Sequence, residues 1–163
     1  ANLPPNAKIV YLQGDGTQDS AVGRWEGFKA ACLDKRPDIQ LLSFVDAGWS
    51  KAEALKTMML WMNMFPEING VVAGNDEMAL GAVAALKGAG RLEGCLISGV
   101  DATSAGLAAV EAGEMSQTIK QDAKAQGESA LTLAEGFLKG NPPSGDLAIP
   151  FTSITAENLA QAK

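Results

Sequence analysis

Short hydrophobic runs alternate with longer segments of mixed polarity over residues 1–121. Glycine, proline or charged residues bound most of the runs, which is typical of buried strands. In the segments between them, apolar residues recur at helical spacing, as on one face of a helix. The predicted strands are 7–14, 39–45, 70–74, 95–100 and 116–120. The predicted helices are approximately 19–35, 50–64, 77–87 and 103–112.

This order of elements predicts an α/β fold. Apolar strands that alternate with helices indicate a parallel sheet covered by helices. The connections between such strands are right-handed, which limits the possible arrangements. We therefore expect residues 1–121 to form one lobe with a doubly wound, mainly parallel five-stranded sheet and helices on both faces.

Residues 122–163 do not continue the alternation. Their pattern predicts an amphipathic helix at 123–139, a strand at 147–154 and a short helix at 157–162. We interpret this segment as an appendage to the lobe. The apolar face of the 123–139 helix has no second layer to bury it. We expect the helix either to pack back on its own lobe or to associate with another copy of the chain.

Polar and aromatic side chains follow the predicted strands. In an open α/β sheet, ligands bind in the crevice beyond the carboxyl ends of the strands. The candidate ligand-binding residues at these positions are Arg24, Trp49, Asn75, Asp101 and Gln121. Together they offer a guanidinium with several N–H donors, a carboxylate acceptor, two amides and a flat apolar ring. A sugar has the complementary anatomy, with hydroxyls around its edge and a C–H face that rests on an aromatic ring.

Each candidate also has a structural explanation. Arg24 fits a solvated helix residue or an ion-pair partner, and Trp49 fits loop packing. Asn75 or Asp76 fits the N-cap of the third helix, and Asp101 that of the fourth. The occurrence of all five candidates at successive strand exits favours a binding site.

Composition narrows the possible chemistry. The formal net charge is −6 without any cluster of basic residues, which disfavours nucleic acid and anionic membranes as partners. The chain has no histidine, which excludes His-dependent triads and the usual zinc sites. The turn at 14–19 lacks the third glycine of a dinucleotide-binding motif. We therefore predict that the chain is not an enzyme and holds neither metal nor cofactor.

Two cysteines, Cys32 and Cys95, are too far apart in sequence for a CxxC motif. They fit either two buried thiols or one disulfide. No signal peptide or membrane span is visible in the sequence. The first residues lead almost directly into a strand, a start that suits an excised or processed chain.

Three segments carry a family resemblance: GRWEGF at 23–28, GNDEMALGA at 74–82 and GVDA at 99–102. In these segments the chain resembles the ribose/galactose-type periplasmic sugar-binding proteins. The resemblance extends over nearly the whole chain. It implies the C-terminal lobe of a two-lobed protein in the periplasm, with a sugar clamped between lobes joined by three crossing strands.

The resemblance also implies roles for individual positions. The ligand contacts of the family match Arg24, Trp49, Asn75, Asp101 and Gln121. Residues 122–163 match the crossing segment, a helix lent to the N-terminal lobe and a returning strand. The implied function is the substrate-binding component of an ABC-type sugar importer, which binds a monosaccharide or polyol and docks on a membrane permease. An effector-sensing domain of a LacI-type transcription regulator, which shares this fold, remains the alternative.

Overall fold

The fold is built on one six-stranded sheet with the order β2-β1-β3-β4-β5-β6. The structure is a computed structural model, and it describes residues 3–142 and 144–162. The strands are β1 (Lys8–Gln13), β2 (Gln40–Asp46), β3 (Gly70–Ala73), β4 (Leu96–Val100), β5 (Gln117–Lys120) and β6 (Thr152–Ile154). The first five are mutually parallel, and β6 pairs antiparallel with β5. The predicted parallel sheet is confirmed, with the appended strand as a sixth member.

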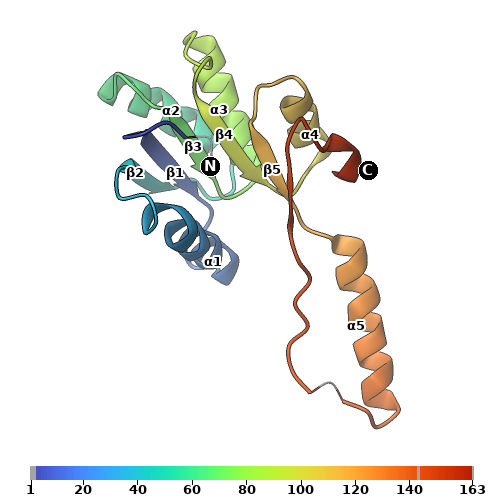
Figure 1. Cartoon of the computed structure of the whole chain (residues 1–163). Helices are drawn as coiled ribbons and strands as arrows, with labels where there is room; N and C mark the ends of the chain where they lie inside the picture. Colours follow the sequence, from blue (N-terminus) through green and yellow to red (C-terminus); the bar gives the residue numbers. More distant parts are fainter. Residues whose placement is uncertain (1–2, 143, 163) are drawn as a thin grey trace.

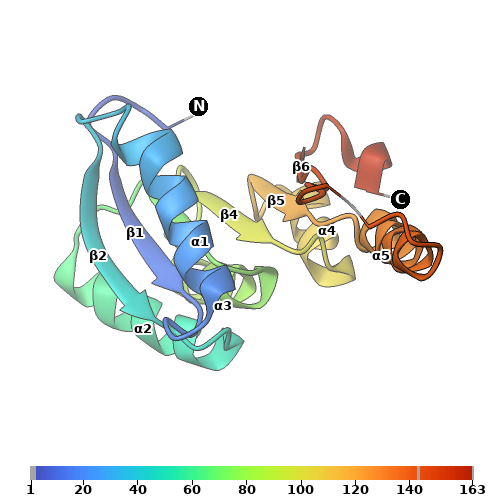
Figure 2. The same cartoon turned by 90° about the horizontal axis from the view of Figure 1, so that it is seen from below.

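The helices cover the two faces of the sheet unequally (Figure 2). Helix α1 (Asp19–Phe28) lies on one face, while α2 (Lys51–Met64), α3 (Asp76–Gly88) and α4 (Ser104–Glu111) lie on the other. The main core lies under these three helices and includes fully buried Met58, Val71 and Ile97. Helices on both faces were predicted, and this prediction is confirmed.

Helix α1 rests on β1 and β2 through aromatic side chains. Tyr11 stacks on Phe44 with ring centroids 5.4 Å apart, and Trp25 meets Phe44 edge-on at 4.7 Å. Burial raises the pKa of Tyr11 to about 12, partly offset by the charge of Arg24. The predicted helix to residue 35 is interrupted, because a π-helical turn at Lys29–Leu33 follows α1. Leu33, the last residue of this wider turn, packs against the small buried cluster of Ala7, Ile9 and Ile39.

One face of the sheet remains largely uncovered over β3, β4 and β5. Val72, Val100 and Ile119 are only half-buried there, whereas Val71 and Ile97 on the opposite face are fully buried. A hollow of about 630 Å³ between α1 and the segment leading to β6 lies over this face. A parallel sheet of this kind is normally covered on both faces. This area of the sheet therefore lacks the layer of helices that normally covers it.

Helix α5 (Ala123–Leu138) extends away from the sheet (Figure 1). None of its residues is buried, and the exposed fractions of Leu131, Phe137 and Leu138 are 70%, 62% and 89%. The helix does not pack back on its own lobe, which was one of the two expected arrangements.

The predicted strand at 147–154 is mostly wrong, because only Thr152–Ile154 are in a strand. Residues 147–151 run beside no strand of the described sheet, and Pro150 lacks an N–H to donate. The predicted final helix is a 3₁₀ turn at Leu159–Ala162.

The two cysteines are free thiols, so the disulfide that the sequence left open does not form. Cys95 is buried directly before β4, and burial raises the pKa of its thiol to about 11. Cys32 is only partly buried. The interpretation of two buried thiols holds for Cys95 alone.

The stability of this fold should depend on β4 far more than on α5. The substitution Ile97→Ala removes a side chain with no exposed surface and should lower the free energy of unfolding by about 2–5 kcal/mol. The substitution Leu138→Ala, at an exposed position, should change it by less than about 0.5 kcal/mol. Urea unfolding followed by circular dichroism measures both values, and equal losses would contradict this description of the core.

Candidate functional site

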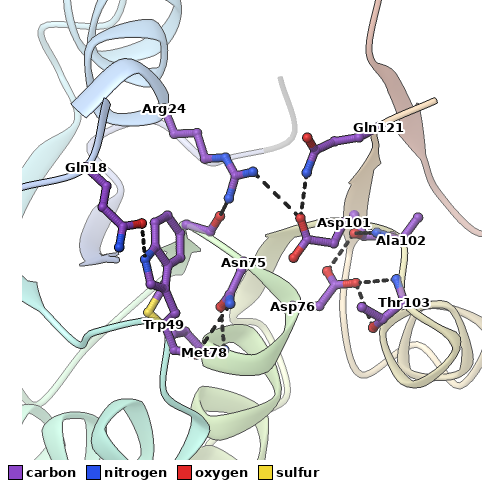
Figure 3. A network of polar contacts seen from close by, with 12 residues as sticks. Gln18, Arg24, Trp49, Asn75, Asp76, Met78, Asp101, Ala102, Thr103 and Gln121 are labelled. Atoms are coloured by element: carbon purple, nitrogen blue, oxygen red, sulfur yellow. Dashed lines mark hydrogen bonds and ion pairs between the residues drawn. The ribbon is translucent and has the colours of Figure 1, made fainter. Parts of the chain in front are cut away.

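The parallel strands bring all five predicted residues to one edge of the sheet (Figure 3). Arg24 lies in α1, and its side chain is 21% exposed. Its Nη1 donates to the carbonyl oxygen of Gly74 at 2.6 Å, directly after β3. Its Nη2 lies 3.7 Å from Oδ1 of Asp101, directly after β4. Arg24 is therefore an ion-pair partner that joins the ends of two strands.

Trp49 lies in the loop between β2 and α2, with its backbone in the left-handed region at φ 61°. Its indole packs where Gly14 and Gly74 leave space, since a Cβ at Gly14 would overlap the ring. The indole Nε1 donates to Oε1 of Gln18 at 3.0 Å. The guanidinium carbon of Arg24 lies 5.3 Å from a ring centroid of the indole, in a cation–π arrangement.

Asn75 is the N-cap of α3, as one of the structural explanations predicted. Its Oδ1 accepts from the backbone N–H of Met78 at 2.9 Å. Its Nδ2 makes a longer contact, 3.4 Å, with the carbonyl oxygen of Trp49. The residue is 9% exposed, so little of its surface remains for a ligand.

Asp101 is the centre of the polar contacts at this edge. Its Oδ1 accepts from Nε2 of Gln121 at 2.7 Å and faces Arg24 as described above. The prediction that Asp101 caps α4 is wrong, because Thr103 is the cap and accepts from the N–H of Gly106 at 3.0 Å. Asp101 and Ala102 both have positive φ, 116° and 52°, which is uncommon for residues other than glycine.

Asp76 lies beneath Asp101 and is fully buried. Its Oδ2 accepts from the backbone N–H and the hydroxyl of Thr103, at 2.8 and 3.0 Å. Its Oδ1 accepts from the hydroxyl of Thr118 at 2.6 Å. Burial raises the pKa of Asp76 above its ordinary value, and the donors from Thr118 and Thr103 partly offset this. From the sequence, Asp76 was a polar residue at the exit of the third strand and a candidate cap of α3, but not a buried acceptor.

Other polar residues at the edge maintain local turns. Asp15 accepts from the N–H and the hydroxyl of Thr17, which lowers its pKa, and Asp46 accepts from the N–H of Gly16. Gln18 was missed as a site residue, because only the folded chain brings it to the indole of Trp49. Its place among the polar residues that follow the first strand was the only available signal.

The arrangement suits the binding of a neutral, hydroxyl-rich molecule. In the part of the chain that the structure describes, Asp101 Oδ2 makes no hydrogen bond, and Asp101 is 34% exposed. This acceptor lies at an edge that also carries the guanidinium of Arg24 and the amides of Asn75 and Gln121. Among the described residues, no group of three or more acidic or cysteine side chains could hold a metal ion. No helix in the described ranges is long and apolar enough to cross a membrane.

Comparison with known proteins places this architecture in a family. Residues 1–142 match the periplasmic binding protein domain. The chain belongs to this family. It is 34% identical over 161 residues to a putative rhizopine-binding protein of Rhizobium meliloti, covering 98% of this chain and 52% of the relative. It is 38% identical over 158 residues to a xylitol-binding protein of Mycolicibacterium smegmatis, covering 96% of this chain and 45% of the relative.

A solved structure of the periplasmic binding protein family has the same fold. An ABC transporter solute-binding protein from Bacillus halodurans with bound myo-inositol superposes with a TM-score of 0.85 at 33% identity. The match covers 96% of this chain and 54% of that one. The chain thus spans about half the length of the relatives it matches. These relatives are binding proteins by name, which agrees with the prediction that the chain is not an enzyme.

The position of Trp49 should depend on the absence of a side chain at residue 14. The substitution Gly14→Ala places a Cβ against the indole and should lower the free energy of unfolding by about 1–3 kcal/mol. A change in the near-ultraviolet circular dichroism should report the displaced ring. The matched control is Gly23→Ala in α1, where a Cβ meets nothing within 4 Å. Its stability should remain the same or rise slightly.

Proposed function

We propose that the chain is the sugar-facing C-terminal lobe of the substrate-binding component of an ABC-type sugar importer. It binds a monosaccharide or polyol without covalent chemistry, in the cleft between this lobe and a second one, and it does so in the periplasm. The names of two relatives, for xylitol and rhizopine, and the myo-inositol in a solved relative support a ligand rich in hydroxyls.

The observation that carries the proposal is the contact of Arg24 with both Asp101 and Trp49. The guanidinium holds the carboxylate at the edge of the sheet and leaves its Oδ2 available to accept from a hydroxyl. Gln121 donates to the same carboxylate and presents an amide oxygen beside it. The partly exposed indole of Trp49 offers apolar ring surface to the C–H side of a sugar. Together these groups match both surfaces of a pyranose or polyol.

Residues 122–163 connect this lobe to the second lobe in the proposal. Helix α5 has an apolar face without a partner in its own lobe, and it lies directly after Gln121 of the site. The extended segment that precedes β6 returns the chain to the sheet (Figure 1). The site therefore lies beside the crossing segments, and hinge closure of the two lobes around the ligand presents a closed form to a membrane permease.

Removal of either charge should weaken sugar binding. In the complete gene product that contains this chain, Arg24→Ala or Asp101→Ala should reduce binding free energy by about 2–5 kcal/mol, because each leaves its partner unpaired. Isothermal calorimetry across a panel of monosaccharides and polyols measures this effect. The control is Lys56→Ala, whose ammonium pairs with Glu53 on the exposed face of α2.

Two results would count against the site. If the complete protein binds no member of the panel, the proposed function is wrong. If either variant keeps the affinity of the unchanged protein, that residue does not contact or orient the ligand. Circular dichroism of each variant must match that of the unchanged protein, so that a loss of binding is not a loss of folding.

The 163-residue chain studied alone should self-associate through α5. Leu131, Phe137 and Leu138 are all exposed on α5, and large exposed apolar surfaces are unfavourable in water. Light scattering should give a mass above that of a monomer, 16.9 kDa, and Leu131→Asp with Phe137→Asp should restore the monomer. The control Lys124→Gln changes an exposed polar residue of the same helix and should leave the mass unchanged. A monomeric unchanged chain with an ordered α5 would contradict this expectation.

A further inference from the structure

The loop that carries Asp101 adopts an unfavourable backbone conformation. Two consecutive residues, Asp101 and Ala102, have positive φ although neither is glycine. Such conformations persist only where the surrounding structure holds them, and they occur often at functional sites. The N–H of Asp101 bonds to the carbonyl oxygen of Ile119 at 2.8 Å, which fixes only the first residue of the pair. Other contacts must fix the rest of the loop.

The carboxylate of Asp76 supplies those contacts. It accepts directly from the N–H and the hydroxyl of Thr103. It reaches Ala102 through Thr118, whose hydroxyl accepts from the N–H of Ala102 at 3.1 Å and donates to Asp76. The two residues that follow Asp101 are thus both held by one buried group that comes from the first turn of α3 (Figure 3).

Three donors reach the carboxylate of Asp76: two hydroxyl groups and one backbone N–H. The hydroxyl of Thr118 accepts from Ala102, and that of Thr103 accepts from Gly106, so each has its single hydrogen left for Asp76. The third donor, the N–H of Thr103, can only donate, so it requires an acceptor oxygen at Oδ2 of Asp76. An amide in place of the carboxylate would present its NH₂ to one of these donors.

The surroundings are shaped to admit this carboxylate. A Cβ at Gly99 of β4 or at Gly106 of α4 would overlap the oxygens of Asp76. Thr103, the N-cap of α4, donates its backbone N–H to this carboxylate. No cation contacts Asp76 in the described ranges, so backbone and hydroxyl donors alone stabilise it.

We propose that Asp76 is a positioning residue for the binding site: its carboxylate holds Ala102 and Thr103 so that Asp101 and Ala102 keep their positive φ and Asp101 points toward Arg24 and Gln121. This inference rests on the function proposed above for its link to affinity. Asp76 does not touch the ligand. It acts through Asp101, whose carboxylate it keeps at the edge of the sheet.

The test replaces the acceptor without changing its size. In the 163-residue chain, Asp76→Asn should shift the backbone NMR signals of Asp101 and Ala102 away from left-handed values. In the complete gene product, the same variant should bind sugar on the order of tenfold more weakly, as expected for misplaced hydrogen-bonding partners. The matched control is Glu77→Gln, which removes the neighbouring carboxylate of the same helical turn at an exposed position. It should change neither measurement.

A second pair of variants keeps the test decisive if Asp76→Asn does not fold. Thr118→Val removes the hydroxyl that joins Ala102 to Asp76, whereas Thr118→Ser retains it. The valine variant should lose the left-handed signals and the affinity, and the serine variant should keep both. Unchanged signals in Asp76→Asn or Thr118→Val, or shifted signals with unchanged affinity, would overturn the proposal. If the unchanged protein binds no sugar, the proposed function fails, and the NMR signals alone decide whether Asp76 holds the loop.

Discussion

The parallel alignment of β1 to β5 is the constraint on which the candidate site depends. All five strands end at the same edge, so residues that are far apart in the chain meet there. Arg24 lies 77 residues before Asp101 in sequence, and their side chains still form an ion pair. Because the edge combines loops from several strands, its chemistry can change while the sheet beneath it remains the same.

The edge is formed at a conformational cost. Trp49, Asp101 and Ala102 all have positive φ, and such backbone conformations cost on the order of 1–3 kcal/mol each. The structure compensates locally for each. Trp49 fits because Gly14 and Gly74 have no side chains in its way. Asp101 and Ala102 are held by backbone pairing to β5 and by the network around Asp76.

The lobe is incomplete as a layered structure. One face of the sheet is bare over β3 to β5, and α5 exposes an apolar face without covering it. In an ordinary doubly wound domain, a helix that follows the fifth strand returns to cover the sheet. Here the helix that follows β5 is α5, and it extends away from the sheet instead. In the described residues both surfaces are left without a covering layer, and the relatives are about twice as long as this chain.

Much of the fold could be predicted from the sequence, because local patterns specify it. Apolar strands between amphipathic helices gave the sheet and its layers, and the strand exits gave the five candidate residues. Local patterns were insufficient where the outcome depended on neighbours. The 147–151 segment lacks a strand partner, and α1 passes into a π-helical turn at Lys29.

The same distinction applies to the site. The sequence by itself determined which residues reach the edge, since their positions follow from the order of strands. Only the tertiary structure decided their partners: Asn75 caps α3, Thr103 replaces Asp101 as the cap of α4, and Gln18 meets Trp49. It also revealed Asp76 as the buried acceptor beneath Asp101, because its donors come from two other elements of the fold. Contacts between distant segments depend on packing, which no local pattern in the sequence specifies.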